Sequence, residues 1–182
     1  GAGIMVDVET GEILAITNYP EYDSSIMSLG KNFSVIDSYM KDNSNPFLNR
    51  AISGLYSPGS TIKLCLALGI LEEDIIDPSK KILSAGFIEI PNPFNKEEKT
   101  IFRDWKAHGL VDLRHAIAVS SNVYFYETAG GFEDQKGLGI SGIEKYAKIC
   151  GFGEKVAESG FFSGEKGVIP TPEWKAKTFN GD

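Results

Sequence analysis

Alternating apolar and polar positions open the chain and predict a β-hairpin. In IMVDVETGEILAIT, residues 4–17, the alternation runs on both sides of Thr10 and Gly11, as is typical of two antiparallel strands joined by a tight turn. We expect residues 1–18 to be a hairpin of a central sheet. Residues 19–59 are rich in Asp, Ser, Asn and Pro, which predicts a long irregular connection of the kind that is usually functional or mobile.

Helical patterns dominate the rest of the chain. Residues 60–182 predict a mainly helical portion that carries a surface insertion of strands and loops near residues 80–104. The run STIKLCLALGILEE, residues 60–73, places apolar side chains on nearly every side of a helix. A helix with this pattern is expected to be buried.

Capping residues delimit two further helices. Asp112 suits the N-cap of a helix that ends before the break at residues 120–122, and a second helical run follows from Val123. The apolar face of the first helix comprises Leu113, Ala116, Ile117 and Val119. Ser141 and Glu144 have the spacing of a capping box, and Gly151 is a typical helix stop. The apolar face between them comprises Ile143, Tyr146, Ala147 and Cys150.

Composition narrows the class of protein. With 182 residues the chain can form one domain with a sizeable core, and 42% hydrophobic with 24% charged residues is typical of a globular protein. The net charge of −7 argues against nucleic acid or an anionic membrane surface as the main partner.

Cysteine and histidine are scarce. Cys65 and Cys150 are too few for a disulfide framework and lie in no metal-binding spacing, so we expect both to be buried structural residues and no metal or cofactor to be bound. Whether the two cysteines pair stays open. His108 and His115 are the only histidines, and no GxSxG motif accompanies them, so a histidine-based hydrolase is disfavoured.

The ends of the sequence indicate a piece of a longer protein. Residue 1 already lies within a predicted strand, and the last residues, KTFNGD, stop abruptly. No apolar run approaches the roughly 20 residues of a membrane span, and no signal peptide is present. For an excised piece these features leave the compartment open.

One Ser-x-x-Lys pair is distinguished by its surroundings. The spacing occurs three times, at Ser28 with Lys31, Ser60 with Lys63 and Ser163 with Lys166, so spacing alone decides nothing. The first and third pairs contain glycine and lie in polar loops. Ser60 follows Pro58 and Gly59 at the start of the apolar helix, where residues i and i+3 share one face and free backbone N–H groups favour an oxyanion.

Ser60 and Lys63 could therefore be a nucleophile and its base. A lysine base must be neutral, and its ordinary pKa of about 10.4 would have to be lowered, which burial and a second nearby cation could do. The alternative is that Ser60 only caps the helix while Lys63 extends to the surface. Local physics leaves both interpretations open.

A second polar group falls in the break between two helices. AVSSNVYFY places Ser120 and Asn122 one residue apart before an aromatic run. A hydroxyl and an amide there could relay a proton and hold a substrate amide. Ser and Asn also serve as caps and turn residues, so this motif alone is weak.

Three stretches together resemble a known family. LNRAISGLYSPGSTIK, FRDWKAHGLVDLRHAIAVSSNVYFYE and VDVETGEILAITNYPEYD are similar to the transpeptidase domain of class B penicillin-binding proteins, and most to the elongation type. The resemblance covers nearly the whole chain. It implies an α/β fold of the α+β type, the penicillin-binding and β-lactamase-like transpeptidase fold, here incomplete because the later core strands are missing.

The resemblance also implies an activity and a site. The family cross-links peptidoglycan as serine D,D-transpeptidases, and by analogy Ser60 is the nucleophile, Lys63 its base, and Ser120 with Asn122 the SxN motif. The implied partners are stem peptides ending in D-Ala-D-Ala, β-lactams and a membrane-embedded glycan polymerase of the elongation machinery. The implied location is the extracytoplasmic side of the bacterial cytoplasmic membrane, with an anchor absent from this sequence.

Two departures from the family stand out. Its third motif, KTG or KSG, is absent: Lys99 and Lys177 precede threonine, but isoleucine and phenylalanine follow. We expect the motif to lie beyond Asp182 and the 182-residue chain alone to be inactive. SGFFSGE, residues 159–165, also differs from its usual counterpart. A β-lactamase, a β-lactam sensor and a non-catalytic scaffold of the same fold remain alternatives.

Overall fold

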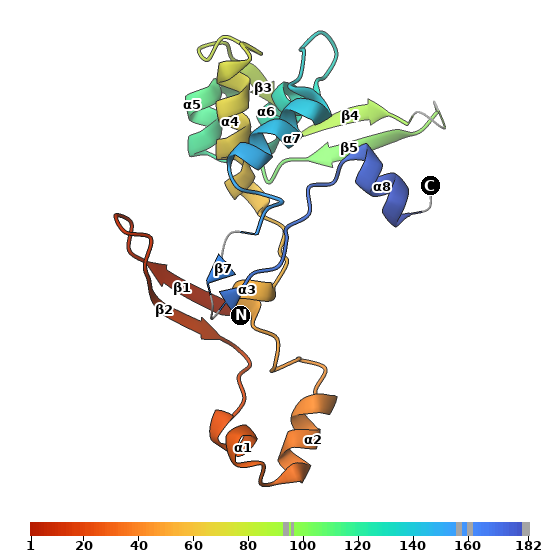
Figure 1. Cartoon of the computed structure of the whole chain (residues 1–182). Helices are drawn as coiled ribbons and strands as arrows, with labels where there is room; N and C mark the ends of the chain where they lie inside the picture. Colours follow the sequence, from red (N-terminus) through yellow and green to blue (C-terminus); the bar gives the residue numbers. More distant parts are fainter. Residues whose placement is uncertain (93–94, 96, 156–157, 160–161, 180–182) are drawn as a thin grey trace. The chain divides into compact units, whose positions relative to one another are not determined.

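A computed structural model of the chain describes residues 1–92, 95, 97–155, 158–159 and 162–179. The chain forms two compact units (Figure 1), and each is described by itself. The smaller unit comprises residues 1–57 and 155–167, and the larger unit comprises residues 58–154 and 168–182. No helix within the described ranges could cross a membrane, because the longest have only 11 residues.

An antiparallel hairpin opens the smaller unit, as the alternating pattern predicts. Strand β1 (Ala2–Val6) pairs with β2 (Ile13–Asn18). The Asp7 carboxylate accepts hydrogen bonds from two backbone N–H groups of the turn, and Gly11 takes a φ of 75°, which glycine adopts without strain. The two strands form a sheet of their own, and Met5 and Leu14 are exposed.

Three short helices replace the irregular connection expected for residues 19–59. They are α1 (Ser24–Leu29), α2 (Phe33–Lys41) and α3 (Arg50–Ser53). Asp23 caps α1 by accepting the N–H of Ser25, so an acidic residue that indicated a loop instead starts a helix. An aromatic cluster packs the rings of Tyr22, Tyr39 and Phe47 with centroids 4.8 to 6.4 Å apart.

The smaller unit also contains a second, minimal hairpin. Strand β7 (Glu158–Ser159) pairs with β8 (Phe162–Ser163). Just beyond it the N–H of Glu165 donates to the carbonyl of Ile52 in α3. The sequence departure at residues 159–165 lies here, and two of its residues, 160 and 161, lie outside the described ranges.

The larger unit is mainly helical and carries the predicted insertion. Its α-helices are α4 (Ile62–Glu72), α5 (Leu113–Ala118), α6 (Asn122–Phe125), α7 (Gly139–Ile149) and α8 (Pro172–Thr178), and a π-helix, Tyr126–Gly130, continues α6. Its strands are β3 (Ile82–Ser84), β4 (Phe87–Pro91), β5 (Lys99–Arg103) and β6 (Gly109–Val111). Strand β4 pairs with β5 as a hairpin, and β3 pairs with β6.

One hydrophobic core holds the larger unit together. Helix α4 contributes Ile70, α5 contributes Ala116 and α6 contributes Tyr124, all of them fully buried. Gly69 allows α7 to approach α4 closely, because a Cβ at this position would lie 2.5 Å from the ring of Tyr146. The core thus fixes α4 against α6 and α7.

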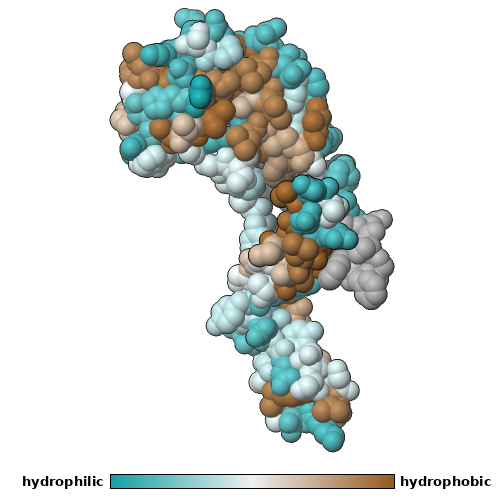
Figure 2. Space-filling model, turned by 90° about the vertical axis from the view of Figure 1, so that its left-hand side faces the viewer, coloured by the Kyte–Doolittle hydropathy of each residue, from teal (hydrophilic) through white to brown (hydrophobic). Residues whose placement is uncertain are grey.

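Helix α4 is not buried on every side, contrary to the expectation from its all-round apolar pattern. Leu64, Leu68 and Leu71 are 59%, 52% and 43% exposed. They form one apolar stripe, because residues at i, i+4 and i+7 share a helix face. Figure 2 shows apolar surface on the visible face of the chain. The apolar stripe of α4 therefore has no packing partner among the described residues of the larger unit.

A disulfide joins Cys65 in α4 to Cys150 at the end of α7, with 6.2 Å between their Cα atoms. Cys65 is buried, as expected, but Cys150 is exposed, so the expected burial was wrong for the second cysteine. Its place at the surface end of α7 explains the difference. The bond ties the helix that carries Lys63 to its packing partner.

The predicted helix ends are partly right. Asp112 caps α5 by accepting the N–H of His115 at 2.8 Å, and Gly151, at a φ of 85°, ends α7. The capping box predicted at Ser141 is wrong, because α7 already begins at Gly139 after Leu138. Leu138 packs against the hydrophobic core, and this contact places the start of the helix two residues earlier.

Candidate active site

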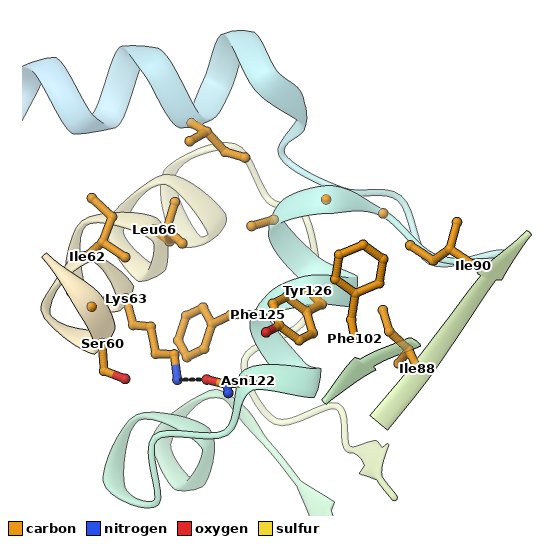
Figure 3. A pocket seen from close by; sticks show the side chains of 15 residues that line it. Ser60, Ile62, Lys63, Leu66, Ile88, Ile90, Phe102, Asn122, Phe125 and Tyr126 are labelled. Atoms are coloured by element: carbon orange, nitrogen blue, oxygen red, sulfur yellow. Dashed lines mark hydrogen bonds between the residues drawn. The ribbon is translucent and has the colours of Figure 1, made fainter. Parts of the chain in front are cut away.

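A pocket of about 680 Å³ in the larger unit has one polar end and long apolar walls. Ser60, Lys63 and Asn122 form the polar end (Figure 3). Ile62 and Leu66 of α4 face this pocket from one side, and the β4–β5 hairpin contributes three apolar residues on another. These three residues are Ile88, Ile90 and Phe102.

Ser60 lies on a 3₁₀ turn, Gly59–Thr61, immediately before α4. Gly59 has a φ of 57°, a left-handed conformation that glycine adopts most readily, so the Pro58-Gly59 pair turns the chain into the helix. The Ser60 side chain is exposed to the pocket, and its Oγ lies 2.9 Å from the Oγ of Ser120.

Lys63 follows on the first turn of α4 and is only 8% exposed. Its Nζ donates to the carbonyl of Ser120 at 2.7 Å, to Ser120 Oγ at 3.1 Å and to Asn122 Oδ1 at 2.6 Å. The ammonium also lies 5.8 Å from the centre of the Phe125 ring. Lys63 does not extend to the surface, contrary to the alternative interpretation of the sequence.

Burial of the ammonium lowers the pKa of Lys63 below its ordinary value, and the carboxylate of Asp104 partly opposes this effect. Removing a cation from water favours the neutral amine, which is the form a base needs. Burial thus lowers the pKa of Lys63, as the sequence led us to expect for a lysine base. The charge near Lys63 is the anion of Asp104, and not the second cation that was expected to act together with burial.

The break between α5 and α6 presents the second pair of polar side chains. Ser120 takes a φ of 54°, Ser121 caps α6 by accepting the N–H of Tyr124, and Asn122 is the first residue of α6. The reversal at Ser120 turns its side chain and its carbonyl toward Lys63. All four residues predicted from the two motifs therefore meet at one place.

The contacts form a chain with Ser120 in the middle. Ser120 Oγ lies within hydrogen-bond distance of both Ser60 Oγ and Lys63 Nζ. Within the described part of the chain, no direct hydrogen bond joins Lys63 to Ser60, although both belong to the same motif. A proton can pass from the Ser60 hydroxyl through Ser120 to a neutral Lys63, so the arrangement suits acyl transfer by a serine nucleophile.

The other Ser-x-x-Lys pairs and Lys-Thr pairs do not join this site. Ser28 and Lys31 are exposed near the end of α1, and Lys166 is exposed. Lys99 forms an ion pair with Glu89 on the β4–β5 hairpin, and Lys177 lies in α8. Within the described ranges, no group of three acidic, histidine or cysteine side chains could hold a metal ion.

Sequence reasoning missed one buried acid behind the site. Asp104, directly after β5, has a fully buried side chain that accepts the Ser121 hydroxyl at 2.9 Å and the Val123 N–H at 3.0 Å. The only sequence signal was its position in FRDWK, inside a stretch of family resemblance. It also missed the apolar wall from the β4–β5 hairpin, which depends on how the hairpin packs.

Comparisons with known proteins show the family to which the chain belongs. The family model described as the penicillin binding protein transpeptidase domain matches residues 1–182. The peptidoglycan D,D-transpeptidase MrdA of Acinetobacter baumannii is 35% identical over 180 residues, which cover 98% of this chain and 25% of that protein. The chain thus spans about a quarter of the length of the curated relatives it matches.

Solved structures give the same result for the fold. Penicillin-binding protein PBP2 from Helicobacter pylori matches with a TM-score of 0.80 and 33% identity, covering 100% of this chain and 32% of that one. The same protein in complex with MreC matches with a TM-score of 0.80 over 98% of this chain and 31% of that one, also at 33% identity. The likeness therefore includes the fold of the whole described chain.

Proposed function

The chain belongs to the penicillin-binding protein transpeptidase family, and from this premise we propose that the whole protein is a peptidoglycan D,D-transpeptidase that acts through a Ser60 acyl-enzyme. The observation that carries the proposal is the chain of contacts from Ser60 Oγ through Ser120 Oγ to Lys63 Nζ. Curated relatives that match 98% of the chain are named peptidoglycan D,D-transpeptidase.

The first half-reaction uses Ser60 as the nucleophile. Its Oγ attacks the carbonyl carbon of the penultimate D-Ala of a stem peptide, and the hydroxyl proton moves through Ser120 to neutral Lys63. The backbone N–H of Ser60, on the 3₁₀ turn just before α4, can donate to the oxyanion. The peptide bond then breaks, the proton goes to the leaving nitrogen, and terminal D-Ala departs.

The second half-reaction transfers the acyl group to a second stem peptide. An amine of that peptide attacks the ester, gives up a proton to the relay, and releases Ser60 with its hydroxyl restored. The amide of Asn122 accepts from Lys63 through its oxygen, and its nitrogen donates to the Arg103 carbonyl at 3.4 Å, which leaves one N–H of that nitrogen to hold the peptide. A β-lactam takes the same path as far as the acyl-enzyme.

Partners and location are part of the proposal. The substrate is a stem peptide ending in D-Ala-D-Ala, and the partner is a membrane-embedded glycan polymerase of the elongation machinery. Relatives solved with MreC and within a peptidoglycan synthase complex support a role in such an assembly. The Cys65–Cys150 disulfide supports an extracytoplasmic location, because disulfides persist in oxidising compartments.

Labelled penicillin tests the proposal on the whole protein. We expect stable labelling that is lost in Ser60→Ala and kept in Ser28→Ala, the serine of an exposed Ser-x-x-Lys pair. Cross-linking of stem peptides by the whole protein without penicillin separates an enzyme from a β-lactam sensor. Rapid penicillin hydrolysis would instead make the protein a β-lactamase, and no labelling would favour a non-catalytic scaffold.

A further inference from the structure

Asp104 is a buried acid that reaches the SxN loop from outside the motif. Its side chain is fully buried, and it stands between β5 and β6, 16 residues before Ser120 in the sequence. A carboxylate is costly to bury unless several donors surround it. The hydrogen-bond donors around the Asp104 carboxylate belong mainly to the SxN loop.

The carboxylate binds the loop on both sides of Asn122. One oxygen accepts the hydroxyl of Ser121 at 2.9 Å and the backbone N–H of Val123 at 3.0 Å. The same oxygen lies 3.2 Å from the hydroxyl of Ser84 in β3, and the other accepts the N–H of Trp105 at 2.8 Å. Ser121 and Val123 are the immediate neighbours of Asn122, so the acid fixes the backbone from which Asn122 projects.

The loop adopts a shape that needs support from its surroundings. Ser120 takes a φ of 54°, a left-handed conformation that a residue with a Cβ adopts only when its surroundings impose it. Helix α6 has four residues and continues as a π-helix, Tyr126–Gly130, and a helical run this short does not sustain itself without tertiary contacts. Asp104 supplies such contacts from a different element.

We propose that Asp104 is a positioning residue for acyl transfer, which holds Ser120 and Asn122 in the geometry that connects Lys63 to Ser60. This inference rests on the proposed transpeptidase function. Asp104 itself does not touch the reacting atoms, and its action passes through the backbone of residues 121–123 and through its charge.

The positioning role of Asp104 can also be tested through the effect of its charge on the pKa of Lys63. Burial opposes ionisation of Asp104, but the N–H groups of Val123, Asn122 and Trp105 and the Ser121 hydroxyl hold its pKa below its ordinary value. The resulting carboxylate raises the pKa of Lys63. His108 also faces it, with Nε2 3.7 Å from a carboxylate oxygen, whereas Arg103 and Lys106, charged neighbours along the chain, are exposed.

The test is the pH dependence of acylation by a fluorescent penicillin, measured on the whole protein. In Asp104→Asn we expect the maximal acylation rate to fall on the order of 10²-fold, as a displaced catalytic group would cause. The acid limb of the profile should move to lower pH, because losing the anion favours neutral Lys63. Asp74→Asn, at an exposed acid just after α4, should leave both quantities unchanged.

A second variant covers the case in which Asp104→Asn does not fold. Asp104→Glu keeps the charge but moves the carboxylate by one methylene, so we expect a lower maximal rate with the acid limb at its wild-type pH. Wild-type rates in folded Asp104→Asn or in Asp104→Glu would overturn the proposal. A loss of rate in Asp104→Asn without any shift of the limb would overturn the part that assigns a role to the charge.

A structural readout separates this proposal from the proposed function. If the wild-type protein takes no penicillin, the transpeptidase proposal fails, and a crystal structure of Asp104→Asn or Asp104→Glu then decides the positioning role. Displacement of Ser120 and Asn122 from Lys63 would support it. An unmoved loop would overturn it.

Discussion

At the scale of single residues, the site depends on a lysine buried among acceptors. Lys63 places its ammonium against the Ser120 carbonyl, the Ser120 hydroxyl and the Asn122 amide oxygen. These contacts offset part of the cost of burial, and burial still lowers the pKa of Lys63. The residue is therefore suited to accept a proton.

Lys63→Arg should abolish acylation at every accessible pH, because a guanidinium remains protonated. In the wild type the rate should rise with pH as Lys63 loses its proton, with the rise centred below the ordinary lysine pKa of 10.5. Time-resolved labelling with fluorescent penicillin measures both. Lys81→Arg, at an exposed position, is the control, and labelling of Lys63→Arg at the wild-type rate would contradict the assignment of the base.

Ser120→Ala should lower the acylation rate by about 10²- to 10⁴-fold, the range typical of lost proton transfer. The reason is that no direct hydrogen bond among the described contacts joins Ser60 to Lys63, and Ser120 Oγ lies between them. Rapid-quench labelling with penicillin measures the rate. Ser141→Ala, at an exposed serine of α7, controls for loss of a hydroxyl, and an equal effect in both variants would exclude the relay.

At the scale of elements, the site depends on how α4 packs. Helix α4 carries Lys63 on a buried face, α6 presents Asn122 to it, and α7 packs closely at Gly69. The disulfide from Cys65 to Cys150 holds α4 to the end of α7. Stability of this packing and precision of the site are therefore linked.

Cys150→Ser should lower the free energy of unfolding by about 2–4 kcal/mol, because the bond closes a long loop, with a sequence separation of 85, in the unfolded chain. Cys150 is exposed, so the serine hydroxyl meets water and adds little cost of its own. Denaturant unfolding of the whole protein without reductant measures the change. Dithiothreitol should destabilise the wild type but not the variant, and coincident curves for the two proteins without reductant would refute the prediction.

At the scale of the whole molecule, each of the two units leaves apolar side chains exposed to solvent. The β1–β2 hairpin is a two-stranded sheet with exposed apolar residues on its strands, and α4 exposes the stripe of Leu64, Leu68 and Leu71. The sequence also contains no KTG or KSG motif. Two strands with open edges make a poor sheet on their own.

The 182-residue chain by itself should therefore not turn over a D-Ala-D-Ala peptide. Its two motifs meet at the pocket, but the sequence contains no KTG or KSG motif. Among the described lysines only Lys63 lines the pocket, and Lys99 pairs with Glu89. Release of D-Ala, followed by chromatography, measures turnover. Release at the rate of the whole protein would show that the chain alone is sufficient.

Much of the fold follows from sequence patterns that act locally. The alternation around Thr10 and Gly11 gives the first hairpin, Asp112 gives the start of α5, and Gly151 gives the end of α7. The helices within residues 19–59 were missed because the residue types that cap helices also favour loops. Asp23, the N-cap of α1, is an example. The start of α7 was missed because a core contact of Leu138, not a capping box, sets it.

The sequence by itself determined the candidate nucleophile, base and second polar pair, because Ser60 with Lys63 and Ser120 with Asn122 stand in distinctive local surroundings. Only the tertiary structure decided that Ser120 lies between nucleophile and base, that Asp104 holds the loop, and that Cys65 and Cys150 pair. The physical reason is the distance along the chain over which each kind of interaction acts. Periodicity and caps act within a few residues, whereas these contacts join positions 17 to 85 residues apart in the chain.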